Sequence, residues 1–305
     1  MQLRENPFAR VLWPSLVLAL FYWGLYGRAP SISVQPDGSE KGMPGKASLA
    51  PEESRRLLDL STTLKRQGKH EEALVPTLTL HESYPENHIY IESLATLCNR
   101  LGRYKEEAQY WEMFLQQAPI PIEGCPQIGQ AYEKQGRAKE AIGAFERCLD
   151  LDPRNLDSLF FLAHSLEMSQ QFDRAAELYG RAAAIDPAYL DLRVGLARVR
   201  LHQGQYAQAK EVAGKVLVQS PSNVDAMLVL GLASWREGNN TQAKGYLQDG
   251  VRLAEKYTDF YVALGSIAEE ENDIPQAIKN YTRVLELDPS NRDIALRRST
   301  LARGN

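Results

Sequence analysis

Residues 54–291 carry apolar side chains at the spacing of amphipathic helices, and their arrangement repeats every 34 residues. In each period a large apolar residue is followed directly by a small one. The large residues are Leu94, Ile128, Leu162, Leu196, Leu230 and Leu264, and the small ones are Ala95, Gly129, Ala163, Ala197, Gly231 and Gly265. A second small position recurs as Ala73, Ala141, Ala175, Ala209, Ala243 and Ala277. Two small positions per period predict two closely packed helices, and the lack of alternating strand-like runs predicts an all-α fold.

Glycine and proline divide each period at fixed places. The glycines are Gly68, Gly102, Gly136, Gly204 and Gly238, and they predict a turn between the two helices, in a left-handed conformation. The prolines are Pro85, Pro119, Pro153, Pro187, Pro221 and Pro289, and they predict the end of the second helix. The resulting units are 54–87, 88–121, 122–155, 156–189, 190–223, 224–257 and 258–291. A single helix pair of this length cannot bury its apolar face, so the pairs are expected to stack.

With Tyr132, Phe145, Tyr179, Tyr206 and Tyr281 at the aromatic positions, this pattern resembles the tetratricopeptide repeat (TPR) family. The resemblance implies a right-handed superhelical solenoid of about seven units within residues 51–305, closed by a capping helix over 292–303. Some residues depart from the pattern. Pro76 lies inside a predicted helix, Glu107 replaces an alanine, and Arg193 and Arg200 stand at apolar positions of the fifth unit.

The amino terminus has a different composition. Residues 11–27 contain no charge and lie between Arg10 and Arg28, which predicts a signal-anchor transmembrane helix within residues 1–28. A cleaved secretory signal is the alternative. Residues 29–50 are rich in Pro, Gly and Ser and are expected to form a flexible linker.

The charges around residues 11–27 predict an orientation. Arg4, Arg10 and the terminal amine precede the segment, which favours a cytoplasmic amino terminus. The helical repeats are then expected on the other side of a single-pass membrane, which is the periplasmic side in a bacterial inner membrane.

Composition and motifs argue against several classes of function. The net charge of −4 gives no basic surface for nucleic acid. The sequence has no motif for a metal, a cofactor or catalysis, so we expect neither enzymatic activity nor a small-molecule substrate. Cys98, Cys125 and Cys148 stand at core positions and are expected to be buried thiols, with a Cys125–Cys148 bond left open.

In the TPR family, positions 2, 5, 9 and 12 of successive units line a concave groove that binds peptides. In units four to six the resemblance places a mostly apolar set there. The candidate groove residues are Phe160, His164, Val194, Arg198, Leu201, Leu228, Leu232 and Trp235. Val194 and Leu228 could instead pack between helices. Trp235 follows Ser234, so the tryptophan is either a core residue of a rotated helix or an exposed anchor.

The resemblance and the anchor together predict a membrane-tethered scaffold that binds apolar or amphipathic segments of partner proteins. The alternative is an accessory or regulatory subunit that recruits a separate catalytic chain to a cell-envelope assembly, secretion or export machinery.

Overall fold

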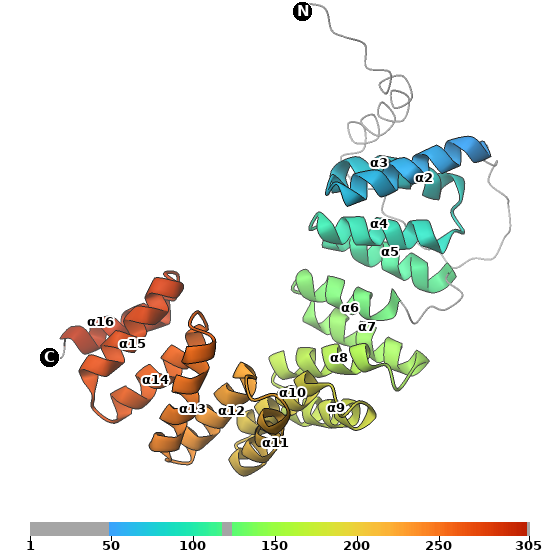
Figure 1. Cartoon of the computed structure of the whole chain (residues 1–305). Helices are drawn as coiled ribbons and strands as arrows, with labels where there is room; N and C mark the ends of the chain where they lie inside the picture. Colours follow the sequence, from blue (N-terminus) through green and yellow to red (C-terminus); the bar gives the residue numbers. More distant parts are fainter. Residues whose placement is uncertain (1–48, 118–123, 304–305) are drawn as a thin grey trace, which may run out of the picture. The chain divides into compact units, whose positions relative to one another are not determined.

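The computed structural model describes residues 49–117 and 124–303, and these residues form helices and turns without a β-strand (Figure 1). The predicted anchor at residues 11–27 and most of the predicted linker at 29–50 lie outside the described residues. Within the described ranges, no helix combines the length and the apolar character that crossing a bilayer requires. The predicted all-α array of about seven helix pairs is confirmed.

The chain divides into two compact units, and Met1–Gly136 is the first. Its helices are α2 (Pro51–Arg66), α3 (His70–Ser83), α4 (His88–Arg100), α5 (Tyr104–Gln117) and α6 (Cys125–Lys134). Helices α2 and α3 pack as one pair, and α4 and α5 pack as the next. Pro76 is buried within α3, and the helix continues through it to Ser83.

The second unit, Arg137–Asn305, holds the remaining helices. They are α7 (Ala138–Leu151), α8 (Leu156–Met168), α9 (Phe172–Ile185), α10 (Leu190–His202), α11 (Tyr206–Gln219), α12 (Val224–Arg236), α13 (Asn240–Leu253), α14 (Thr258–Glu270), α15 (Ile274–Leu287) and α16 (Arg292–Arg303). Each helix packs on the next along the chain, and α10 also packs on α12. Helices α8, α10, α12 and α14 begin at the first residues of the predicted units four to seven.

Local sequence explains where these helices begin and end. Asn155 and Asn223 accept hydrogen bonds from the amides of Ser158 and Ala226, which caps α8 and α12. The five turn glycines all have positive φ, between 71° and 82°. Helix α13 ends at Leu253 without a following proline, and the Ala254 amide donates to the Gly250 carbonyl there as the equivalent amides do at the helices that a proline follows.

Small residues allow neighbouring helices to touch, both within a pair and between successive pairs. The alanines at the second small position, from Ala73 to Ala277, are fully buried where the repeat has them. Tyr179 of α9 is also fully buried, and a Cβ added to Gly195 of α10 would lie 2.5 Å from its ring. Glycine at this point therefore makes room for a buried aromatic side chain of the preceding helix.

The cysteines differ in oxidation state. Cys98 is a free, buried cysteine, as expected. Cys125 and Cys148 are each disulfide-bonded, so the expectation of buried thiols is wrong for these two residues.

Candidate partner-binding surface

The eight candidate groove residues lie on α8, α10 and α12, the first helices of units four to six. All of them belong to the second compact unit. An α-helix turns 100° per residue, so positions three or four residues apart share a face, as Phe160 and His164 do on α8 and Leu228 and Leu232 on α12. Seven of the eight side chains are half-buried.

Val194 is the exception, because it is only 5% exposed. It belongs to a core cluster with Ala213, Val216 and Val229, and Leu201 packs against the same cluster from its edge. Val194 is therefore a core residue that lies beneath the surface, whereas Leu201 keeps part of its side chain in solvent.

Leu228, Leu232 and Trp235 form the apolar part of the surface on α12. They pack on a cluster that includes Met227, Phe260 and Ile267, and all three remain half-exposed. A side chain in this situation has apolar area left to bury against a partner, at about 25 cal/mol per Å².

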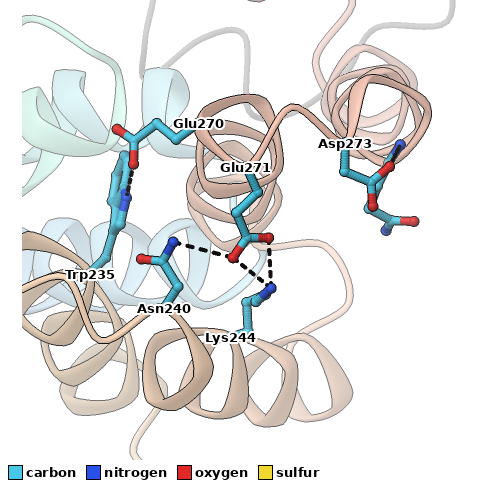
Figure 2. A network of polar contacts seen from close by, with 7 residues as sticks. Trp235, Asn240, Lys244, Glu270, Glu271 and Asp273 are labelled. Carbon is cyan, nitrogen blue, oxygen red and sulfur yellow. Dashed lines mark hydrogen bonds and ion pairs between the residues drawn. The ribbon is translucent and has the colours of Figure 1, made fainter.

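Trp235 is oriented by a hydrogen bond to the next first helix. Ser234 is fully buried, so α12 is not rotated and the tryptophan is not the core residue of this turn. The indole Nε1 donates to Glu270 Oε2 at 2.6 Å, and the Arg236 guanidinium lies 4.7 Å from the ring centroid. Figure 2 shows the indole directed at the Glu270 carboxylate, with Asn240 and Lys244 bound to the neighbouring Glu271. Trp235 is thus an oriented, half-exposed aromatic side chain.

Arg198 is held by a buried carboxylate. Its Nε and Nη2 donate to the two oxygens of Glu167 at 2.5 and 2.8 Å, while Tyr179 Oη donates to Glu167 Oε2 at 3.2 Å. The Glu167 side chain is 6% exposed and that of Arg198 is 39% exposed. The paired guanidinium therefore presents its outer edge to solvent in a fixed orientation.

Burial and the charge of Glu167 raise the pKa of Tyr179 above its ordinary value. The hydrogen bonds from Arg198 to Glu167 raise the pKa of the guanidinium as well. Both groups therefore keep their protons throughout the physiological range.

The α8 end of the surface is aromatic. Phe160 stacks on Tyr189, with ring centroids 6.0 Å apart, and meets Tyr179 edge to face. His164 lies one turn further along α8, is half-buried, and forms no hydrogen bond with the described residues.

Models of the tetratricopeptide repeat family match residues 166–217, residues 127–189 and 194–257, and residues 258–291. Together these matches cover residues 127–291, which is more than half of the chain. The chain is a TPR protein.

Solved TPR structures share its fold. A tetratricopeptide repeat protein from Parabacteroides merdae is 15% identical, with a TM-score of 0.68 over 82% of this chain and 98% of its own. A thermophilic TPR protein from Thermus thermophilus, TTC0263, is 20% identical, with a TM-score of 0.54 over 59% of this chain and 98% of its own. YrrB, described as a TPR protein with an unusual peptide-binding site, is 19% identical, with a TM-score of 0.52 over 61% of this chain and 96% of its own. At these identities the likeness shows the fold. No curated protein matches the chain.

The family positions alone do not reveal the Glu167 network, but the spacing of its glutamate and tyrosine occurs a second time in the sequence. Glu269 and Tyr281 repeat the spacing of Glu167 and Tyr179 three units later, and Tyr281 Oη donates to Glu269 Oε2 at 2.9 Å. Arg297 of α16 supplies the cation, at 2.7 Å. A glutamate that accepts hydrogen bonds from a tyrosine and from an arginine of a later helix therefore occurs at two places in the described part of this TPR array.

The chemistry of the surface is that of binding. TPR proteins are protein–protein interaction scaffolds and are typically not catalysts. In residues 49–117 and 124–303, no three His, Cys, Asp or Glu side chains come together as a metal site. What the surface offers is half-exposed apolar area, one oriented arginine and one histidine.

Proposed function

We propose that this TPR protein is a membrane-tethered scaffold that binds apolar or amphipathic segments of partner proteins along α8, α10 and α12. The observation that carries the proposal is the set of half-exposed apolar side chains on these helices, which are Phe160, Leu201, Leu228, Leu232 and Trp235. Apolar side chains grouped in this way on a scaffold usually mark a contact surface.

Trp235 is the proposed anchor of this surface. Half-exposed tryptophans are among the residues that contribute most to binding energy, because one rigid side chain buries a large area at little cost in conformational entropy. The hydrogen bond to Glu270 fixes the indole before a partner arrives.

Arg198 is the hydrogen-bond donor that this surface offers to a partner. Because Glu167 already pairs with it, the guanidinium is better suited to a backbone carbonyl or an amide of the partner than to a second carboxylate. The ligand we propose is therefore a mostly apolar segment with a neutral polar group near Arg198.

The proposed tether is the uncharged segment 11–27, and we propose that the TPR array lies on the periplasmic side of a bacterial inner membrane. The arginines before this segment support that orientation. The oxidised state of Cys125 and Cys148 also supports it, because disulfides persist mainly in oxidising compartments.

The test is capture of partners from detergent-solubilised membranes with the tagged full-length chain. Trp235→Ala is expected to lower the yield of captured partners at least about tenfold, the effect of losing an interface anchor. Trp235→Phe keeps the aromatic area and should retain most of the capture. Leu253→Ala, at a 53% exposed leucine of the second helix α13, is the matched control.

Trp235→Ala and Leu232→Ala variants that remain folded and capture partners as well as the unaltered chain would contradict the proposal. Mass spectrometry of the captured proteins also separates a scaffold of several partners from an accessory subunit of one enzyme.

A further inference from the structure

Arg193 occupies a position where several other TPR units have an apolar core residue. The fourth residue of the unit is Ile91 in α4, Leu159 in α8 and Met227 in α12, each at most 7% exposed. Arg193 stands at this place in α10 and is half-buried. An arginine cannot fill an apolar interior without a partner for its charge, so the interior at this place stays unfilled.

A pocket of about 460 Å³ lies at this position. Residues of α9, α10 and α11 line it, namely Ala183, Arg193, Leu196, Val212, Lys215, Val218 and Gln219. Leu196 in the pocket wall is half-exposed, as is its counterpart Leu264 in unit seven, whereas Leu94, Ile128, Leu162 and Leu230 are at most 4% exposed.

The pocket is distinct from the proposed partner-binding surface. On α10, Arg193, Leu196 and Arg200 share one face of the helix, because they are separated by three and four residues. Arg198 lies roughly 140–160° around the same helix from these three residues, and Leu201 lies roughly 80–140° from them. The other walls of the pocket come from α9 and α11, the second helices of units four and five.

The two cationic side chains that line the pocket differ in whether they have a hydrogen-bond partner. Lys215 Nζ donates to Glu211 Oε1 at 2.6 Å, so its charge has a partner one turn away on α11. The Arg193 guanidinium makes no hydrogen bond or ion pair with any residue that the structure describes. A half-buried, unpaired guanidinium beside apolar walls is suited to a carboxylate, which it can bind through two parallel hydrogen bonds.

We propose that this pocket is a second docking site, for a protein segment in which an apolar side chain stands next to an Asp or Glu. The apolar side chain enters between Leu196 and Val212, and the carboxylate pairs with Arg193. Charge complementarity and the apolar walls argue for this ligand together.

A protein segment fits this pocket better than a free amphiphile. Val218, on the rim, is 84% exposed, so the pocket is open to solvent on that side. Small ligands generally bury most of their surface in a closed site. A partner protein can cover the open rim with its own surface, and it then buries Val218 as well.

The test is fluorescence anisotropy on the full-length chain with labelled ten-residue peptides. Each probe carries one Leu or Phe next to one Glu in a Ser/Gly background, and a matched set has Gln in place of Glu. Decanoate, a free carboxylate with an apolar chain, is added as a competitor. We expect Glu-containing probes to bind, at least one of them tenfold more tightly than its Gln counterpart.

Arg193→Leu restores the apolar core residue, so this variant is expected to unfold at a higher temperature and to bind the same probe at least tenfold more weakly. Arg193→Gln removes the charge at similar length and should weaken binding to a similar degree. Arg252→Leu, at an arginine side chain that is 75% exposed on α13, removes one cation elsewhere and should leave binding unchanged.

Several results would overturn the proposal. These are the absence of binding by every Glu-containing probe, equal binding of the Gln set, and unchanged binding by a folded Arg193→Leu variant. Tighter binding of decanoate than of any peptide would overturn the assignment to a protein partner.

Discussion

At the scale of single residues, the turn inside each repeat keeps a positive φ even where its residue is not glycine. Five units use a glycine with positive φ, while units four and seven place Gln170 and Asn272 in the same conformation, with φ of 59° and 60°. The 34-residue spacing predicted these two turns although neither residue is a glycine. The repeated packing on both sides thus imposes a backbone conformation that Gln170 disfavours by about 1–2 kcal/mol.

We expect Gln170→Gly to raise the free energy of unfolding by about 0.5–1 kcal/mol. Glycine removes the cost of the left-handed conformation but adds entropy to the unfolded chain, and the first effect is larger. Urea denaturation measures the change. Asn272→Gly is the matched control and should change stability less, because asparagine tolerates this conformation. A lower stability for Gln170→Gly would contradict this account.

At the scale of helices, the sequence predicted an array of about seven helix pairs because small residues, prolines and turn residues repeat together. It predicted the contacts of individual side chains less well. Whether Trp235 faced the core depended on the rotation of α12, which the buried Ser234 and the bond to Glu270 resolve. Glu167 escaped notice because the pattern of one unit does not reveal that Arg198 of the next unit pairs with it.

Gly195→Ala is expected to lower the free energy of unfolding by about 1–3 kcal/mol, although alanine is the better helix former. The added Cβ would lie 2.5 Å from the Tyr179 ring, and overpacking of a buried contact has about this cost. Gly180→Ala, in α9, is the control. No atom lies within 4 Å of its added Cβ, so this variant should gain up to about 1 kcal/mol.

Both variants are compared by urea denaturation, and equal effects of the two would contradict the packing explanation. Because Tyr179 also donates to Glu167, Gly195→Ala is expected to disturb the orientation of Arg198 and with it the proposed partner-binding surface.

At the scale of the whole molecule, family resemblance predicted the class of protein. The proposed compartment is instead inferred from the terminal segment and from the cysteines. The repeat pattern suggested buried thiols because Cys125 and Cys148 stand at core positions. A periodic pattern says which residues are buried, but oxidation depends on the distance and direction between two side chains, which a sequence does not contain.

The oxidation state gives a prediction for the intact protein. When the purified chain is denatured without reductant, an alkylating reagent should label one thiol, at Cys98, and after reduction it should label three. Mass spectrometry counts the labels. Three labels without reductant, in protein taken directly from its native cells and acid-quenched, would contradict both the disulfide-bonded state and the proposed oxidising compartment.

The central claim is that partners bind the first helices of units four to six, and photocrosslinking in intact cells tests it most directly. Benzoyl-phenylalanine is placed at His164 or Leu232 on the proposed surface, and at Leu253 or Leu296 as exposed positions elsewhere. The account predicts strong adducts with the same partner proteins from positions 164 and 232, and weak or no adducts from 253 and 296. Adducts that are absent at 164 and 232 but present at the control positions would contradict it.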